Sequence, residues 1–350
     1  MTRVLATVGP SLGSEKEIEE FYKLGVRTFR INLGKRKRPN VDYYNNLKKC
    51  KQRHNDIRIL IDLPTDRPRV SCLTNNIKCN SGDYAIFLDA SNQLDTCSVI
   101  PLLHFNKYYN EIKKSTSIFM DDGKTEFDIQ LCDDFTKRLT CVCKKSLVEI
   151  KSDTSVVFNG VNIKFDLVTE EDQFFLDSID QGIDYLSISF VQNQADVKFV
   201  RDWFEKRYGT VKIISKIEKK SALKNIDEII EVSDGIIVAR GDLLQNINPI
   251  ELPKIQKMLV QKAHEYNCIS IVATQMFETF ASKGYYKCSE LCDVSQAASQ
   301  NVDYIMLSGE SASSKYAKEV VKSIIQIISN EKKSYIKLNP NYINHFLGGK

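Results

Sequence analysis

The sequence predicts an α/β protein: a closed (β/α)8 barrel with an all-β domain inserted after its third strand. Two observations lead to this fold class. Apolar, β-branched runs alternate with helical patterns three times before residue 70 and five times after residue 166, and eight strands close such a barrel. Between these two regions the pattern changes to short alternating segments separated by turn residues, which is typical of β-structure.

The first part of the barrel is expected to alternate strand, helix, strand, helix, strand. Ser14 is a candidate helix N-cap because Glu17 stands three residues later, the spacing of a capping box. The predicted strands cover residues 3–9, 28–33 and 57–63, and the predicted helices run to Leu24 and over residues 41–53.

The insert is predicted to cover residues 70–166 as a β-barrel-like lid domain. Its alternating segments are residues 84–88, 117–120, 126–131 and 139–142. The turn sequences Asn-Ser-Gly-Asp at 80–83 and Asp-Asp-Gly at 121–123 separate strands within it. The barrel is then expected to occupy residues 1–69 and 167–330, followed by a partly ordered tail at 331–350.

Four successive strands of the second half end in polar side chains. The strand ends are 215–218 (Ser-Lys-Ile-Glu), 239–242 (Ala-Arg-Gly-Asp), 273–276 (Ala-Thr-Gln-Met) and 307–310 (Leu-Ser-Gly-Glu). The carboxyl ends of barrel strands meet on one face, where the active site lies. Lys216, Glu218, Asp242, Thr274 and Ser308 would therefore meet there. A cation, two hard-metal ligands and two hydroxyls suit phosphoryl transfer.

Composition favours a cytoplasmic protein. The net charge of +4 is mild and gives no reason to expect a nucleic-acid or membrane partner. The N-terminus has no secretory pattern, and no apolar stretch is long enough to span a bilayer. The ten cysteines include no Cys-x-x-Cys pair. Cys141 and Cys143 share one strand face, where reduced buried thiols are a simpler explanation than a metal site.

The strand ends, in this order and spacing, resemble those of pyruvate kinase. The resemblance runs from Leu5 to about Ile328 and is strongest from 182 to 316. The segments 7–10 (Thr-Val-Gly-Pro), 225–229 (Asn-Ile-Asp-Glu-Ile) and 232–235 (Val-Ser-Asp-Gly) add to it. Pyruvate kinases carry a β-rich lid at the same point, after the third strand. They continue into a C-terminal domain, which this chain is expected to lack.

The resemblance implies a role for each strand-end residue. Glu218 and Asp242 match the ligands of Mg²⁺ or Mn²⁺, and Lys216 matches the lysine against the transferring phosphoryl group. The structural alternatives are helix caps and a plain Lys216–Glu218 ion pair. Thr274 and Ser308 match hydroxyls that hold substrate and relay a proton, although strand-end hydroxyls are also common as structural groups.

Three further groups are implied around the substrate. The backbone N–H groups of Gly241 and Asp242 match a cradle for the substrate carboxylate. Arg30 and Arg69 match arginines that neutralise the phosphoryl group, with salt bridges as the alternative.

Other positions depart from the family. Asn32 and Asp62 remain as remnants of a monovalent-cation site, but Gly34 replaces a serine ligand, and Arg67 aligns with a glutamate that accompanies potassium dependence. We therefore expect that potassium is not required. Asn159 replaces a lysine that binds nucleotide phosphates in the family, so the identity of the nucleotide partner remains open.

The run 35–38 (Lys-Arg-Lys-Arg) follows the second strand on the predicted active-site face. It fits a solvated turn, and it also fits replacement phosphate contacts made by Lys35 and Arg36. A nuclear-import-like or nucleic-acid patch is the third interpretation, which no aromatic-interleaved basic surface supports.

The sequence thus predicts a Mg²⁺-dependent phosphotransferase acting between phosphoenolpyruvate, or a related enol phosphate or 2-oxo acid, and a nucleotide. Its expected partners are small molecules, and a homo-oligomer is compatible with the pattern. The alternatives are a non-catalytic binding or scaffold protein on the same fold, and a variant that uses a different phosphoryl partner.

Overall fold

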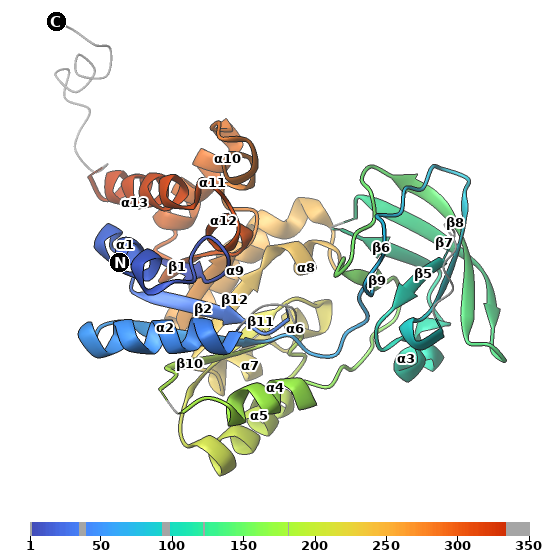
Figure 1. Ribbon diagram of the computed structural model, residues 1–350, viewed down its shortest axis with the longest axis horizontal. Coiled ribbons are helices and arrows are strands. Elements are labelled where there is room, and N and C mark those ends of the chain that lie inside the picture. Colours follow the sequence, from blue (N-terminus) through green and yellow to red (C-terminus); the bar gives the residue numbers. More distant parts are fainter. Residues whose placement is uncertain (1, 35–39, 93–98, 122, 181, 334–350) are drawn as a thin grey trace, which may run out of the picture.

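Eight parallel strands form a closed barrel, as predicted (Figure 1). The computed structural model describes residues 2–34, 40–92, 99–121, 123–180 and 182–333. The strands follow one another around the barrel in the order β1-β14-β13-β12-β11-β10-β3-β2. Their bounds are β1 Arg3–Thr7, β2 Thr28–Asn32, β3 Arg58–Leu63, β10 Tyr185–Ile188, β11 Lys212–Ile217, β12 Gly235–Ala239, β13 Ile269–Ala273 and β14 Tyr304–Leu307.

Helices surround the barrel. The predicted capping box starts α1, where Glu17 N–H donates to Ser14 Oγ and Glu17 Oε2 accepts from Ser14 N–H. The helix ends at Gly25, whose φ of 108° suits a residue without a Cβ.

None of the helices in the described ranges is both long and apolar enough to cross a membrane. The helices are α1 Glu15–Leu24, α2 Asn40–Arg53, α4 Glu170–Asp177, α5 Gln194–Tyr208, α6 Lys220–Lys224, α7 Ile226–Glu231, α8 Arg240–Leu244, α9 Leu252–Glu265, α10 Glu278–Lys283, α11 Cys288–Ser299, α12 Gly309–Ala312 and α13 Ala317–Lys333, with a 3₁₀ turn at Pro249–Glu251.

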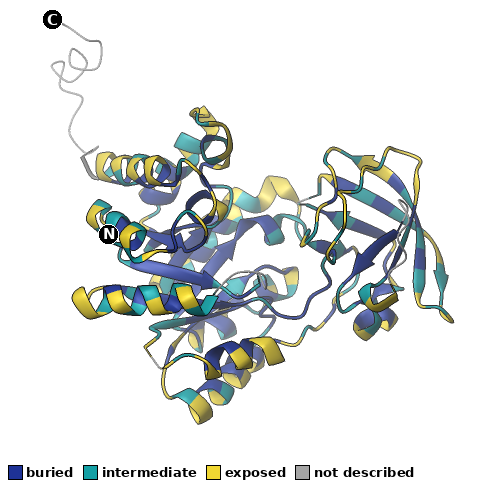
Figure 2. Ribbon diagram, viewed as in Figure 1, coloured by how far each residue is buried: buried dark blue, intermediate teal, exposed yellow. Residues whose placement is uncertain are grey.

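The strands are buried on both faces, which explains why they read as continuous apolar runs. Inward-facing side chains such as Leu60, Ile237 and Met306 fill the barrel interior. Outward-facing side chains such as Phe29 and Ile213 pack under the helices. Figure 2 shows the buried strands inside a ring of helices whose outer faces are exposed. A solid barrel interior leaves the strand ends as the place for a site.

The insert is a six-stranded sheet in the order β5-β4-β8-β7-β6-β9, so the prediction of a β domain is confirmed. It also contains a helix, α3 (Phe105–Ile112), where the sequence predicted only β-structure. Phe105, Tyr108, Tyr109 and Ile112 are buried at helical spacing against the sheet, a period missed among the strand patterns. The strands are β4 Tyr84–Asp89, β5 Val99–Leu102, β6 Ser117–Met120, β7 Thr125–Asp133, β8 Arg138–Ser146 and β9 Val156–Phe158.

The cysteines of the described ranges are all free thiols. Cys141 and Cys143 are buried in the core of the insert, on the inner face of β8. Burial raises the pKa of both thiols, and a neutral thiol is a poor metal ligand. The two residues therefore act as small apolar side chains, in line with the simpler of the two interpretations.

Polar contacts join the insert to the barrel. Asp66 follows β3 and accepts hydrogen bonds from the Tyr108 hydroxyl and from the backbone N–H of Asp166. On the return path, Asn162 Nδ2 donates to Gln192 Oε1 over 2.8 Å. Asp66 is buried, and a buried carboxylate needs such donors. These contacts fix where the insert meets the carboxyl ends of the strands.

Candidate active site

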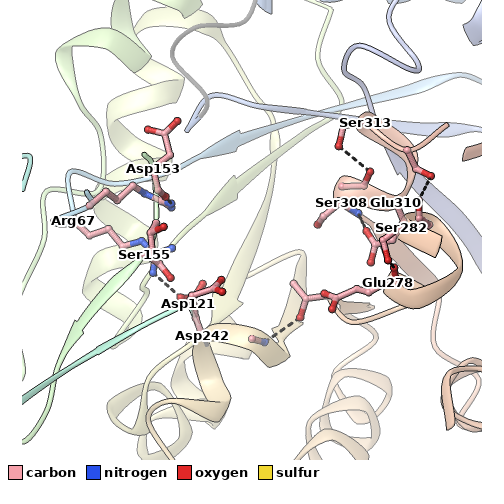
Figure 3. Close-up of a pocket in the computed structure, with 17 residues that line it drawn as sticks. Arg67, Asp121, Asp153, Ser155, Asp242, Glu278, Ser282, Ser308, Glu310 and Ser313 are labelled. Atoms are coloured by element: carbon pink, nitrogen blue, oxygen red, sulfur yellow. Dashed lines mark hydrogen bonds and ion pairs between the residues drawn. The ribbon is translucent and has the colours of Figure 1, made fainter. Parts of the chain in front are cut away.

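Strand ends of the barrel and loops of the insert together line a cavity of about 650 Å³ (Figure 3). Five of the predicted site residues line it: Arg69, Gly241, Asp242, Thr274 and Ser308. Figure 3 shows Arg67 and Asp242 on one side of the cavity, facing Ser308 and Glu310 on the other. The cavity is large enough for a small phosphorylated substrate.

A buried ion network brings together four more of the predicted residues. Lys216 Nζ, on β11, lies 3.2 Å from Glu218 Oε1 and 3.6 Å from Asp62 Oδ1. Arg30, on β2, holds the other Asp62 oxygen at 2.5 Å. Glu218 Oε2 accepts the backbone N–H of Phe190 at 2.6 Å. Two cations and two carboxylates thus compensate one another in a water-poor interior.

The network shifts the two carboxyl groups in opposite directions. Burial opposes ionisation of Asp62, but Lys216 and Arg30 outweigh it and lower the pKa of Asp62. Burial raises the pKa of Glu218, and the charge of Asp242 adds to this rise, while Lys216 opposes it. Glu218 is therefore the carboxylate that gains most from an additional positive charge nearby.

Asp242 forms an ion pair that links the network to the cavity. Arg67 Nη1 lies 2.6 Å from Asp242 Oδ1, and its guanidinium stacks over the Phe190 ring at 4.7 Å. Burial would raise the pKa of Asp242, but Arg67 outweighs it and lowers that pKa. No local pattern in the sequence indicates this pair, because the partners lie 175 residues apart.

Protein groups contact both remnants of the monovalent-cation site, although Asp62 Oδ1 has no hydrogen-bond partner among the described residues. Asn32 Oδ1 accepts the backbone N–H of Gly34 at 3.0 Å, and Asp62 is held by Arg30 and Lys216. The sequence placed Arg67 at this site, whereas the structure pairs it with Asp242. The positive charges beside Asp62 are therefore those of Arg30 and Lys216.

Thr274 is held in a strained conformation at the cavity. Its φ is 67°, a left-handed value that a β-branched residue rarely adopts. Arg240 stabilises this turn by donating to the carbonyl oxygens of Ala273 and Thr274. Asp293 binds the same guanidinium at 2.7 Å. Arg240 is a positioning residue that the sequence did not reveal, although it stands at a predicted strand end.

One of the two donors in the predicted cradle of backbone N–H groups has a partner within the protein. In the structure, the N–H of Gly241 donates to Thr274 Oγ1 at 3.0 Å. That donor is therefore engaged by a neighbouring side chain, because the turn after β13 lies directly against the start of α8. Gly241 and Asp242 still line the cavity.

Glu310 was not predicted as a functional residue. Its Oε2 accepts the backbone N–H of Ser308 at 2.8 Å, and it lines the cavity although it is almost fully buried. Burial raises the pKa of Glu310 to about 7. Carboxyl groups with shifted pKa values cluster at functional sites. The sequence signal that could have identified Glu310 is its position in the polar strand end at 307–310.

Arg69 lies at the boundary between barrel and insert. It pairs with Ser155 across an isolated β-bridge, and its Nη1 donates to the carbonyl oxygen of Asp153 over 3.3 Å. Burial and the charge of Arg67 lower the pKa of Arg69. Two neighbouring guanidinium groups at a cavity wall favour an anionic ligand. Lys35 and Arg36 lie outside the described residues.

Glu218 and Asp242 suit a divalent cation. The charge of Asp242 contributes to the raised pKa of Glu218, and a cation shared by the two carboxylates would relieve that repulsion. The described residues contain no cluster of three or more His, Cys, Asp or Glu side chains arranged for a metal. A hard ion such as Mg²⁺ needs only one or two carboxylates when water and substrate oxygens complete its coordination.

Comparisons with known proteins agree with this geometry. The family model "Pyruvate kinase, barrel domain" matches residues 1–321. The pyruvate kinase of Staphylococcus aureus (strain MRSA252) is 29% identical over 351 residues, which cover 96% of this chain and 58% of the relative. That of Thermoplasma acidophilum is 31% identical, over 93% of this chain and 57% of the relative.

A solved structure shares the fold. The crystal structure of Cryptosporidium parvum pyruvate kinase superimposes with a TM-score of 0.87 at 23% identity, covering 96% of this chain and 71% of that one. The chain thus spans a little under three-fifths of the length of the curated relatives named above. With its barrel matched from residue 1 to residue 321, the chain belongs to the pyruvate kinase family.

Proposed function

We propose that this chain catalyses Mg²⁺-dependent phosphoryl transfer between phosphoenolpyruvate, or a related enol phosphate, and a nucleotide. The observation that carries the proposal is the buried network of Lys216, Glu218, Asp62 and Arg30 beside the cavity that Asp242 lines. Buried charges are costly. A fold that keeps four of them at its strand ends is better explained by chemistry than by stability.

Each residue of the proposed site has a separate task. Lys216 would stabilise negative charge on the phosphoryl group and the enolate oxygen, because its ammonium already lies among carboxylates at a water-poor site. Arg30 and Arg69 would neutralise the remaining phosphoryl charge. Glu218 and Asp242 would hold the divalent cation, which polarises substrate oxygens when bound.

Proton delivery would use the hydroxyls. Thr274 Oγ1 lies at the cavity, where Gly241 N–H orients it. A threonine hydroxyl is too weak an acid to act alone, so we assign it to a relay through water. Ser308 lines the same cavity, next to Glu310, whose pKa of about 7 suits proton exchange near neutral pH.

The test is the turnover of the Lys216→Met variant. Loss of an electrostatic contact in the transition state lowers the rate by about a hundredfold or more. Lys212→Met changes an exposed lysine on the same strand and should keep full activity. A folded Lys216→Met protein with near-normal turnover would contradict the assignment. Phosphorus NMR with phosphoenolpyruvate and a panel of acceptors identifies the reaction itself.

A variant with another phosphoryl partner is the second candidate. Asn159, which replaces the family's nucleotide-binding lysine, uses its backbone N–H and its side-chain amide to bind Ser117 inside the insert. It therefore lacks both the charge and the reach of a lysine. An acceptor in the panel that outperforms every nucleoside diphosphate would favour this candidate.

Metal-dependent binding of oxalate, a mimic of enolpyruvate, separates both candidates from a non-catalytic scaffold. A thermal shift with oxalate that requires Mg²⁺ and disappears in Asp242→Asn would support the phosphotransferase. The absence of any metal-dependent shift in the folded wild-type protein would favour the scaffold.

A further inference from the structure

A second cavity, of about 570 Å³, lies at the junction of the insert and the barrel. It shares no lining residue with the cavity of the candidate active site. Three segments form its walls: residues 157–162 of the insert, residues around α6, and residues 245–248 after α8. We call it the junction cavity. Its volume falls in the range of small-molecule sites.

The junction cavity is strongly basic. Lys219, Lys220 and Lys224 line it, together with one serine and the side-chain amides of four asparagines and one glutamine, and no aspartate or glutamate is among the lining residues. Lysines gathered around a concave surface repel one another unless an anion lies between them. The lining therefore has the positive charge of an anion site.

Lys219 is the fixed part of this lining. It is 8% exposed, and its Nζ donates to the carbonyl oxygen of Ile163 over 2.5 Å. An ammonium has three donors, so this contact uses one of them. Glu218 and Asp196 influence Lys219 electrostatically, but neither of them lines the junction cavity.

Lys220 and Lys224 are the adjustable part. Both are exposed on α6, one helical turn apart. Neither forms an ion pair with any residue in the described part of the chain. Single exposed lysines are common on any protein surface. Here two of them share a cavity wall with a buried third.

We propose that the junction cavity binds a small anion that carries two or more phosphate groups. Three lysines match such a charge, since lysine binds phosphate as a point charge. The volume of about 570 Å³ suits a small molecule. This inference is independent of the proposed function, because a catalytically inactive chain would bind the anion equally well.

Binding at this place would connect two parts of the fold. The insert contributes the wall at 157–162 and the barrel contributes the lysines. An anion that contacts both walls binds more tightly when they are close together, and it therefore favours the arrangement that brings them together.

Calorimetry with inorganic pyrophosphate and tripolyphosphate, without divalent cations, tests the proposal. The variant Lys220→Gln/Lys224→Gln removes the two exposed lysines. The control Lys254→Gln/Lys257→Gln removes the same charge from exposed positions on α9. We expect the first variant to weaken binding by about tenfold or more, and we expect the control to bind like the wild-type protein. The ligands should also protect Lys220 and Lys224 from acetylation, as measured by mass spectrometry.

Several outcomes would overturn the proposal. Equal losses in both variants would indicate a general charge effect. Unchanged affinity in Lys220→Gln/Lys224→Gln would place the anion elsewhere, for example in the active-site cavity. No binding of either anion at millimolar concentration would also refute it. An oligonucleotide that binds more tightly than tripolyphosphate, with loss in the same variant, would replace the small anion with nucleic acid.

Discussion

Replacing Lys216 with methionine should make the stability of the protein depend strongly on pH. Lys216 is 12% exposed on its side chain and lies between two carboxylates, Asp62 and Glu218, that are each 1% exposed. Methionine fills a similar volume without the charge. The substitution therefore isolates the electrostatic contribution of the lysine from its packing.

The magnitude follows from the partners that each carboxylate keeps. Asp62 retains two contacts with Arg30, at 2.5 and 2.7 Å. Glu218 retains the backbone N–H of Phe190, so it loses the larger share of its compensation. Breaking a buried ion pair costs about 3–5 kcal/mol, and we expect the lower end, about 3 kcal/mol at pH 8. The midpoint of thermal unfolding should fall by about 4 °C.

The sign of the pH dependence can be derived from the same contacts. Burial and Asp242 already raise the pKa of Glu218 above its usual 4.5, and loss of Lys216 raises it further. A carboxyl with a raised folded-state pKa costs nothing while it is protonated, below about 4.5, and it destabilises the fold increasingly as the pH rises through the folded-state value. Asp62 contributes a constant part over this range, because the stability from its lowered pKa is already fully present above its usual 3.8. The deficit of Lys216→Met should therefore grow from pH 5 to pH 8.

Urea unfolding followed by the fluorescence of Trp203, the single tryptophan, measures this deficit. Trp203 lies on α5 of the barrel. Lys212→Met, at the exposed start of the same strand, is the matched control and should stay within about 0.5 kcal/mol of wild type. Lys216→Met/Glu218→Gln should recover most of the loss, since glutamine removes the uncompensated charge. The reasoning fails if Lys216→Met is as stable as the control at pH 8, or if Glu218→Gln does not rescue it.

Three further predictions concern single residues of the site. Thr274→Val should slow the exchange of pyruvate methyl protons with deuterated water more than it slows phosphoryl transfer, while Thr274→Ser keeps both; unchanged exchange in a folded Thr274→Val protein would remove the relay role. Turnover should persist in a tetramethylammonium buffer free of potassium and sodium, because Arg30 and Lys216 already place two positive charges beside Asp62; a steep, saturable rise on adding potassium would show that the cation site survives. Glu310→Gln should abolish the loss of stability that wild type shows as the pH rises from about 4.5 through about 7, and parallel pH–stability curves for the two proteins would refute the assignment.

Local signals made much of the fold predictable. The capping box of Ser14 and Glu17 depends on residues three positions apart, and it was confirmed at the start of α1. The buried strands of the barrel were recognisable because they are apolar on both faces. Helix α3 was missed because it is only eight residues long and lies between strands, where its spacing is easily taken for an alternating pattern.

The candidate site was only partly predictable, for a different reason. Strand ends can be read from the sequence, and the barrel geometry then brings Lys216, Glu218 and Asp242 to one face. Pairs such as Arg240–Asp293 join residues 53 positions apart, so no local pattern announces them. The pKa of Glu310 depends on burial, a property of the folded chain that its strand-end position alone does not reveal.

The contact between Asp166 and Asp66 has a consequence for the evolution and engineering of this chain. These residues stand 100 positions apart, yet one hydrogen bond of 2.8 Å joins them where the chain leaves the barrel and returns to it. A segment whose two ends already meet can be lengthened, shortened or exchanged as a cassette at little entropic cost to its host. If another domain were grafted between these two positions, the barrel would therefore stay closed. The graft would change only the part of the protein that covers the carboxyl ends of the strands.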